Sequence, residues 1–370
     1  IRTIVEKWDH LLKTEISFLT EDYLQEKYPL ETGPVNLFIN GALCPDHELV
    51  NKISSLQPQE ALVKGDLLLA LVSNAPTPPS IQELIELNNF HKKEYNQEIS
   101  LINQPSDIFR LNEAQIRSDF KEITADRKSA PIDDPHTIVY GKENIFVEEG
   151  ARIRAAILNA EKGPIYIGKN AEVHEGAIIK GSFALLENSH VNMGAKMRGD
   201  TTVGPFSKVG GEIGNSVIFG YSNKAHEGYM GNSVIGEWCN IGADSNTSNL
   251  KNNYANVKIW NYAKEGFKDT GLLFCGLIMG DHSKCGINTM FNTGTVAGVS
   301  ANIFGDGFPR NFIPSFAWGG ASGFTTFQLR KVFEVAEKVM ERRGLQLEEV
   351  DKAIMKHIFY ITAKFRAWEK

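Results

Sequence analysis

A histidine and a tyrosine, His226 and Tyr229, lie three positions apart in residues 222–250. Histidine has an ordinary pKa near 6.5, so its imidazole accepts a proton at neutral pH. Transfer of an acyl group from a thioester to an amine needs such a base, a donor for the tetrahedral oxyanion, and groups that hold both reactants in line. We therefore take His226 as the candidate general base for acyl transfer.

Polar residues around His226 suit the other roles in this reaction. Tyr229 and Asn249 are candidates for binding sugar hydroxyls, and Lys258 is a candidate partner for a phosphate. Backbone amides between Asn240 and Ala243 are candidate oxyanion donors. A histidine at the turn of a repetitive structure is more often structural than catalytic, so these assignments depend on the element that holds the stretch.

A six-residue period runs through the middle of the chain and predicts that element. Hexads are typical of a left-handed parallel β-helix in which three short strands close each triangular coil and coils stack ~4.8 Å apart. Glycine and asparagine at the corners accept the positive φ that tight turns need. The sequence therefore predicts a β-helix over residues 126–318, with inserted loops at 159–164 and 251–271. The aliphatic positions that carry the period are Ile167, Val173, Ile179, Leu185, Val191, Met197, Val203 and Val209.

Residues 1–125 alternate helical and strand-like patterns and predict an α/β domain. We expect helices at 2–12, 81–87 and 107–124, and strands at 35–39 and 65–72. In an open α/β sheet, ligands bind beyond the carboxyl ends of the strands, which makes residues 40–46 the part nearest to chemistry; a plain connecting loop is the commoner role. Because the chain begins at Ile1 without a methionine, we expect a missing N-terminal segment and an incomplete domain.

Residues 319–370 predict a helical cap. An amphipathic pattern covers residues 324–343 and ends at Gly344, and a second helical stretch follows at 345–370. A basic amphipathic helix can lie on a membrane surface. Packing against the end of the coil is the stronger expectation, because a solenoid needs its end covered.

Composition excludes several classes of function. A net charge of −6 argues against a large nucleic-acid footprint, although a local basic cluster suffices for a small anionic substrate. No apolar run approaches the ~18 residues of a membrane span, and no signal peptide is visible. The four cysteines show no zinc-ligand spacing and are expected to be reduced thiols. We expect a cytoplasmic protein.

The run S-N-K-A-H-E-G-Y-M-G-N-S-V-I-G-E-W-C-N-I-G-A-D-S-N-T-S-N-L, residues 222–250, resembles the acetyltransferase half of the GlmU-like bifunctional sugar-1-phosphate nucleotidylyltransferase/amino-sugar-1-phosphate acetyltransferases, in particular the archaeal-type and divergent bacterial branches. The family pattern has a histidine, a tyrosine three positions on, an N-x-G-A turn and an Asn-Leu some twenty residues beyond the histidine. Here these are His226, Tyr229, residues 240–243, and Asn249 with Leu250. Lys258 matches the family's later lysine, and residues 278–288 are similar to its next coil.

The resemblance implies acetyl-CoA-dependent N-acetylation of a hexosamine 1-phosphate, with glucosamine 1-phosphate as the first candidate. It implies that His226 deprotonates the sugar amine, and that Tyr229, Asn249 and Lys258 hold the sugar phosphate. Asn240 and Ala243 would line the acetyl-CoA side. The family couples this step to nucleotidyl transfer with UTP or another NTP and Mg²⁺ in the first domain, giving a UDP-sugar such as UDP-GlcNAc.

The chain departs from the better-known GlmU enzymes at several positions. Their Arg-Pro-Gly for the sugar phosphate is Asn192-Met193-Gly194 here, and their second phosphate-binding lysine falls near Gly214. Asp244 replaces a turn glycine. Their glycine-rich nucleotide loop does not occur in this sequence. The identity of the amino sugar therefore stays open, and no nucleotidyl-transfer residue is assigned.

A homotrimer is expected, because one triangular coil cannot enclose coenzyme A and a groove between neighbouring prisms would. Two alternatives remain: a nucleotidyltransferase whose β-helix is only a trimerising or regulatory platform, and a non-catalytic scaffold or metal hydratase on the same fold. His174, His190 and His282 are rival zinc ligands, but no histidine pair has HxxxH or HxxxxH spacing, so we expect turn or surface roles and no metal. Arg310 and Arg330 are candidates for a cofactor phosphate, although exposed arginines are commonly just solvated.

Overall fold

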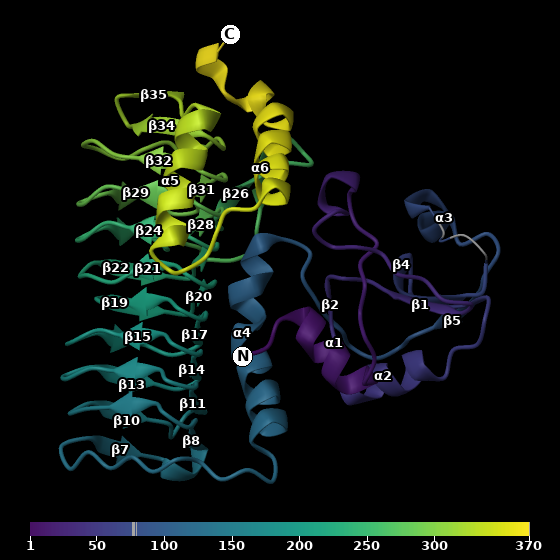
Figure 1. Ribbon diagram of the computed structural model, residues 1–370, viewed down its shortest axis with the longest axis horizontal. Helices are drawn as coiled ribbons and strands as arrows, with labels where there is room; N and C mark the ends of the chain where they lie inside the picture. The colour runs from purple at the N-terminus through teal and green to yellow at the C-terminus, as the bar shows by residue number, and fades with distance from the viewer. Residues whose placement is uncertain (76–77, 79, 370) are drawn as a thin grey trace. The chain divides into compact units, whose positions relative to one another are not determined.

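The structure is a computed structural model and describes residues 1–75, 78 and 80–369 (Figure 1). The chain folds as two compact units. The first spans Arg2–Gln104, and the second begins at Pro105 and includes Ile1. Across the described residues, no helix combines the length and the apolar character that a membrane crossing requires.

The first unit is built on a four-stranded sheet of order β1-β4-β3-β5 and has the predicted mixture of helices and strands. Leu49, Leu62 and Leu69 are fully or almost fully buried in its core. Its strands are β1 (Asn36–Ile39), β2 (Leu43–Cys44), β3 (Glu60–Lys64), β4 (Leu67–Ser73), β5 (His91–Glu94) and β6 (Ser100–Leu101); its helices are α1 (Ile4–Leu12), the 3-10 helix η1 (Asp22–Leu24), α2 (His47–Ser54) and α3 (Ile81–Glu86).

The sheet of this unit is open, as predicted, but its strands do not simply alternate with helices. No helix separates β3 from β4: Gly65, whose φ is 57°, lets the chain reverse at once, so β3 and β4 pair antiparallel. Strand β1 is also antiparallel to β4, and among the described strands of this sheet β3 and β5 form the one parallel pair. The argument that placed a ligand near residues 40–46 consequently fails. Asp46 there caps α2 by accepting a hydrogen bond from the Leu49 amide at 2.9 Å.

The second unit contains the predicted parallel β-helix, whose coils stack one above another in Figure 1. Three parallel sheets form its faces. The first face comprises β7 (Ile138–Tyr140), β10 (Ile157–Asn159), β13 (Ile178–Lys180), β16 (Lys196–Met197), β19 (Glu212–Gly214) and β22 (Tyr229–Gly231). The second face comprises β8 (Ile145–Val147), β11 (Ile165–Ile167), β14 (Phe183–Leu185), β17 (Thr201–Val203), β20 (Val217–Ile218), β23 (Val234–Ile235), β28 (Ile278–Met279), β31 (Val296–Ala297) and β33 (Phe312–Ile313).

The third face carries the candidate site. Along its two-residue strands the first residue points outward and the second is buried, as for Val173, Val191 and Val209. The hexad period thus marks the inward positions, as the sequence predicts. The third face comprises β9 (Arg152–Ile153), β12 (Glu172–Val173), β15 (His190–Val191), β18 (Lys208–Val209), β21 (Asn223–Lys224), β24 (Asn240–Ile241), β29 (Lys284–Cys285), β32 (Asn302–Ile303), β34 (Ala317–Gly320) and the antiparallel β35 (Gly323–Thr326).

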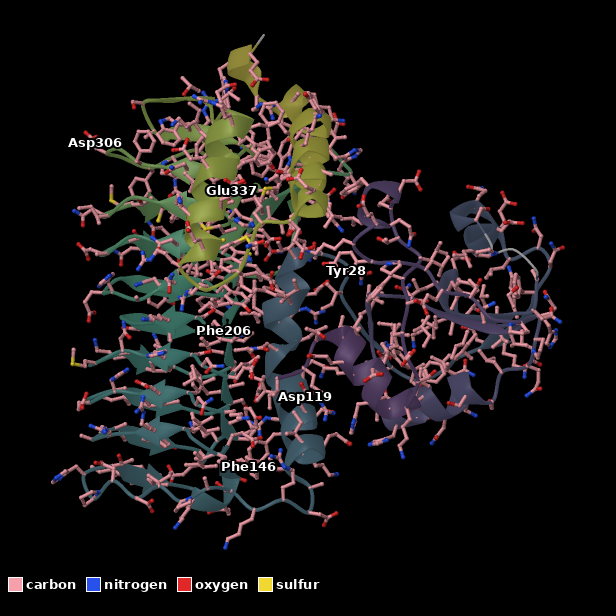
Figure 2. All side chains as sticks on the ribbon, viewed as in Figure 1. Tyr28, Asp119, Phe146, Phe206, Asp306 and Glu337 are labelled. Atoms are coloured by element: carbon pink, nitrogen blue, oxygen red, sulfur yellow. The ribbon has the colours of Figure 1, made fainter. Side chains whose placement is uncertain are left out.

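Aromatic residues occupy the corner between the second and third faces. Phe206, Tyr221 and Trp238 have φ of 58° to 60° there, a conformation that bulky side chains rarely adopt. Their rings stack, with centroids 4.9 Å apart for Phe206–Tyr221 and 4.2 Å for Tyr221–Trp238. Phe206 is labelled in Figure 2. Ring stacking offsets part of the backbone strain, and the resulting column gives the neighbouring helix an apolar surface.

Helices and inserted segments surround the coil. Helix α4 (Pro105–Thr124) packs on the second face. Its Asn112 side chain donates to the Asp200 carbonyl at 2.8 Å, and its Ile116 side chain is buried. Helices α5 (Leu329–Glu341) and α6 (Glu349–Ile361) lie beside the last coils, with the α5 side chain Val332 in one cluster with Trp238 and Phe316 (Figure 1). The first residues of the predicted helix 324–343 instead form β35.

The predicted insertion at 251–271 is a hairpin of β26 (Lys258–Asn261) and β27 (Gly266–Asp269). Strands β25 (Asn246–Thr247) and β30 (Met290–Phe291) pair with each other, and β25 also contacts β22 of the first face. The remaining short elements are the 3-10 helices η2 (Lys142–Asn144), η3 (Ala363–Phe365) and η4 (Ala367–Glu369).

Candidate functional site

His226 lies in the turn between β21 and β22, at the corner where the third face meets the first. Its side chain is exposed. The turn is held from inside the coil by Lys224, which occupies an inward position where neighbouring coils have aliphatic residues. Its Nζ donates to the carbonyl oxygens of His226 at 2.5 Å and Glu227 at 2.9 Å. Burial lowers the pKa of Lys224 to about 8.

Gly228 fixes the other end of this turn. Its φ is 114°, and a Cβ at this position would lie 2.1 Å from the Ser245 carbonyl oxygen of the next coil. Only glycine fits this approach without displacing the backbone. The His226 turn is therefore anchored by an internal ammonium on one side and by close backbone packing on the other.

A cleft of about 720 Å³ opens beside His226. Asn223, Asn240 and Ala243 of the third face line one wall, and Val339 at the end of α5 lines the other. The structure thus brings three predicted site residues, His226, Asn240 and Ala243, to one cavity. Of the four amides from Asn240 to Ala243, those of Asn240 and Gly242 already donate to the next coil, at 3.1 Å each, so the Ala243 amide at the end of this run is kept as the candidate oxyanion donor.

The cleft is basic although the whole chain carries a net charge of −6. The described residues that line it include two lysines of the third face and two arginines at the end of α5, and no aspartate or glutamate; burial lowers the pKa of one of these lysines, Lys284. Such a lining suits a ligand with several phosphates. Sequence reasoning missed these four residues, and Arg310 and Arg330, which it considered, do not line the cleft. The four are Lys208, Lys284, Arg342 and Arg343.

Cys239 also lines the cleft but is unsuited to nucleophilic catalysis. Its Sγ lies 3.2 Å from the Gly280 carbonyl oxygen, to which the thiol donates. Burial raises the pKa of the Cys239 thiol far above its ordinary value, which keeps it protonated. The imidazole of His226 remains the cleft's candidate for proton transfer.

Tyr229 and Asn249 form a second cluster, on the first-face side of His226. The Asn249 amide donates to the Tyr229 hydroxyl at 3.0 Å and to Asn232 Oδ1 at 2.8 Å. Gly231 makes room for this pair, because a Cβ there would lie 2.3 Å from the Tyr229 hydroxyl and 2.7 Å from the Asn249 side-chain nitrogen. Tyr229 and Asn249, each predicted as a sugar ligand, are therefore in direct contact with each other, and their role toward a sugar stays a prediction.

Lys258 is placed on the β26–β27 hairpin, opposite Asp269, with an exposed side chain. Among the described hydrogen bonds and ion pairs, none joins Lys258 to Tyr229 or Asn249. Its assignment to a sugar phosphate stays a prediction. On the first face, Arg198 lies against Gly214, whose Cβ would be 3.1 Å from Arg198 Cβ, and its guanidinium pairs with Glu212 at 3.0 Å. Arg198 is thus a cation that sequence reasoning missed on this side.

Comparison with known proteins extends over both units. Residues 1–128 match the family model described as sugar nucleotidyl transferase. The chain is 24% identical over 223 residues to the bifunctional protein GlmU of Synechococcus elongatus, which covers 56% of this chain and 44% of that protein. It is 30% identical over 145 residues to a bifunctional sugar-1-phosphate nucleotidylyltransferase/acetyltransferase of Sulfurisphaera tokodaii, covering 39% of this chain and 36% of the relative. The GlmU of Methanococcus aeolicus is 26% identical over 281 residues, covering 76% and 58%.

The chain thus spans about half the length, or less, of the first curated relatives that it matches. Among solved structures, the UDP-N-acetylglucosamine acyltransferase of Francisella novicida aligns with a TM-score of 0.31 and 15% identity, over 64% of this chain and 86% of that one. The polySia-specific acetyltransferase NeuO aligns with a TM-score of 0.28 and 15% identity, over 53% and 85%. The sequence matches confirm the predicted resemblance.

Proposed function

We propose, for a chain that is GlmU-like in sequence in both halves, that the β-helix is an acetyl-CoA-dependent N-acetyltransferase acting on a hexosamine 1-phosphate, with glucosamine 1-phosphate as the first candidate. One observation carries the proposal: His226 occupies a corner with a basic cleft on one side and the Tyr229–Asn249 pair on the other. A base between an anionic cofactor and a sugar has the placement that acyl transfer needs.

In the proposed reaction, the amine nitrogen of the sugar attacks the thioester carbonyl carbon. His226 accepts the proton that the amine loses, and the Ala243 amide donates to the oxyanion of the tetrahedral intermediate. When the intermediate collapses, the carbon–sulfur bond breaks and coenzyme A leaves as a thiolate, which takes the proton from His226. The products are the N-acetylated sugar phosphate and coenzyme A.

The phosphates of acetyl-CoA are assigned to the basic lining of the cleft. Lys208 and Lys284 approach from the third face, and Arg342 and Arg343 from α5, so a polyphosphate between the two walls would meet cations on both sides. Asn240 and Ala243 lie beside it. The cleft differs from the predicted groove between subunits, because one chain's own helix supplies its second wall. A homotrimer remains part of the proposal, with neighbouring prisms enclosing the acetyl end.

The sugar is assigned to the Tyr229–Asn249 side. Both side chains offer hydrogen-bonding groups to ring hydroxyls. Lys258, with its long side chain, is retained as the partner of the sugar phosphate. The choice of glucosamine 1-phosphate among the hexosamine 1-phosphates is based on the family resemblance.

We assign nucleotidyl transfer to the N-terminal region on the basis of its match to the sugar nucleotidyl transferases. It would use UTP or another NTP with Mg²⁺ and give a UDP-sugar such as UDP-GlcNAc from the acetylated sugar phosphate.

Mass spectrometry of one reaction mixture tests the proposal. The purified protein is incubated with acetyl-CoA, UTP, Mg²⁺ and a panel of hexosamine 1-phosphates. We expect one acetylated sugar, recovered as the sugar phosphate or as the UDP-sugar, for each coenzyme A released. A folded protein that makes a UDP-sugar but acetylates no member of the panel would contradict the acetyltransferase and favour the platform role of the β-helix.

A further inference from the structure

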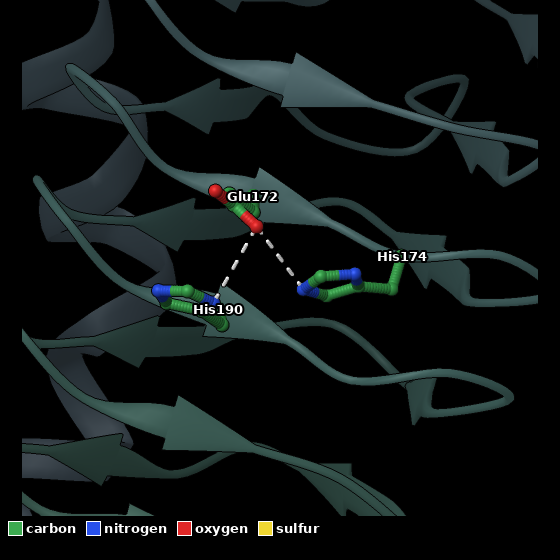
Figure 3. A group of neighbouring side chains, drawn as sticks. All are labelled: Glu172, His174 and His190. Atoms are coloured by element: carbon green, nitrogen blue, oxygen red, sulfur yellow. Dashed lines mark ion pairs between the residues drawn. The ribbon is translucent and has the colours of Figure 1, made fainter.

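Two histidines and a glutamate meet on the third face, where His190 lies one coil before Lys208 of the cleft (Figure 3). Glu172 on β12 lies directly opposite His190 on β15 in the parallel register, and His174 follows β12 in the chain. One nitrogen from each imidazole and one carboxylate oxygen all lie within 4.8 Å of one another. The rigid coil therefore holds three metal-ligand groups together.

The spacing within this cluster fits ligands around an ion. Glu172 Oε2 lies 3.4 Å from His174 Nε2 and 3.7 Å from His190 Nδ1. Both distances exceed the 2.7–3.2 Å of an ordinary N–H···O hydrogen bond. Two ligands ~2.1 Å from a tetrahedral zinc ion are about 3.4 Å apart, which is close to the two separations measured from Glu172 Oε2.

The surroundings orient the glutamate and leave a coordination position open. Arg152 pairs with Oε1 of Glu172, so the other oxygen, Oε2, is the one that faces both imidazoles. A partner on the second oxygen is the kind of interaction that orients a metal-binding carboxylate. All three side chains are partly exposed, between 19% and 32%. A water or an exogenous ligand can therefore complete a four-coordinate site.

We propose that Glu172, His174 and His190 bind one divalent transition-metal ion, of which zinc best suits two imidazoles and a carboxylate. The ion would join two successive coils, because His190 lies on the coil after that of Glu172. This site replaces the expectation that the coil holds no metal. The signal in the sequence was the 18-residue interval between Glu172 and His190, one coil of three hexads, and not a helical HxxxH spacing.

Metal content and an anomalous-scattering measurement test the site. Tag-free protein is stripped of metal with a chelator, incubated with ZnCl₂ and freed of excess zinc. The zinc content per chain is then measured by inductively coupled plasma mass spectrometry. We expect about one zinc per chain for the wild type and for His136→Ala, which removes an exposed histidine outside the cluster. His174→Ala, His190→Ala and Glu172→Gln should each lower retained zinc at least tenfold.

Crystals of the wild type soaked in ZnCl₂ provide a readout that needs no variant to fold. The expected result is an anomalous peak at the zinc edge between the three side chains. An anomalous peak found only elsewhere would overturn the site. Unchanged zinc retention in the His174→Ala/His190→Ala double variant would overturn it as well. Failure of the wild type to retain zinc would overturn it also, and would leave a carboxylate flanked by two protonatable imidazoles.

Discussion

The side-chain nitrogen of Lys224 lies 2.5 Å from the carbonyl oxygen of His226, and the two residues are separated by a single alanine. This contact runs from the interior of the coil outward, because Lys224 is 1% exposed and His226 is exposed. A buried ammonium thus occupies an inward position and fixes the backbone from which the candidate base projects.

Replacing Lys224 with methionine should loosen that turn without emptying the core. Displacement of a catalytic group by ~1 Å can cost about a hundredfold in rate, so we expect kcat for acetyl transfer to fall roughly ten- to a hundredfold with both KM values little changed. Steady-state kinetics measure this. Met197→Leu, an inward substitution on the first face, is the control and should leave kcat unchanged. An unaltered kcat in folded Lys224→Met protein would show that Lys224 is not needed to position His226.

The same lysine makes stability depend on pH. Burial lowers its pKa in the folded protein to about 8, from 10.5. Between these values the unfolded chain binds more protons than the folded one, so the free energy of unfolding should rise with pH in that window. Urea unfolding of the wild type and Lys224→Met, compared from pH 8 to 10.5, isolates this effect. The wild type should gain stability relative to the variant; a flat or falling difference contradicts the assignment.

The arginines at the end of α5 should govern cofactor affinity. Hydrogen bonds to charged groups contribute about 1.5–3 kcal/mol each, so Arg342→Ala/Arg343→Ala should raise KM for acetyl-CoA roughly tenfold or more and leave KM for the sugar unchanged. Arg330→Ala, on the same helix but outside the cleft, is the matched control. Initial rates at varied acetyl-CoA decide the point. Equal KM values in the double variant and the control would place the cofactor elsewhere.

Gly231 should govern sugar affinity. An added Cβ would lie 2.3 Å from the Tyr229 hydroxyl and so must separate Tyr229 from Asn249. We expect Gly231→Ala to raise KM for the amino sugar phosphate roughly tenfold, about the value of one or two lost hydrogen bonds, with KM for acetyl-CoA unchanged. Gly266→Ala serves as the control, because its nearest contact would be an ordinary 3.7 Å. A change confined to KM for acetyl-CoA would reverse the assignment of the two sides.

The β-helix was predictable because every inward position of a coil must be filled, which imprints a six-residue period on the sequence. Lys224 interrupts that period, and nothing local predicts that its ammonium finds carbonyl partners inside the coil. Strand β3 was missed because its five residues end directly at Gly65, where a short apolar run offers no period to detect. Local patterns therefore predicted the repeat but not the exceptions within it.

The cleft was only half predictable. His226 and Asn240 are close in sequence and belong to successive coils, so the repeat alone brings them together. Arg342 and Arg343 lie about a hundred residues later, and their place in the cleft depends on where α5 packs on the column of Tyr221 and Trp238. That packing requires aromatic residues at positive φ, which composition and propensity argue against.

The most direct test of the account is the rate of acetyl transfer by His226→Ala. General-base catalysis contributes about a hundredfold to ten-thousandfold, and the exposed side chain can be removed without disturbing the core. We predict that coenzyme A release with the preferred hexosamine 1-phosphate falls at least a hundredfold while the circular dichroism spectrum and any UDP-sugar formation stay as in the wild type. Acetyl transfer within tenfold of the wild type would contradict the assignment of His226 as the base.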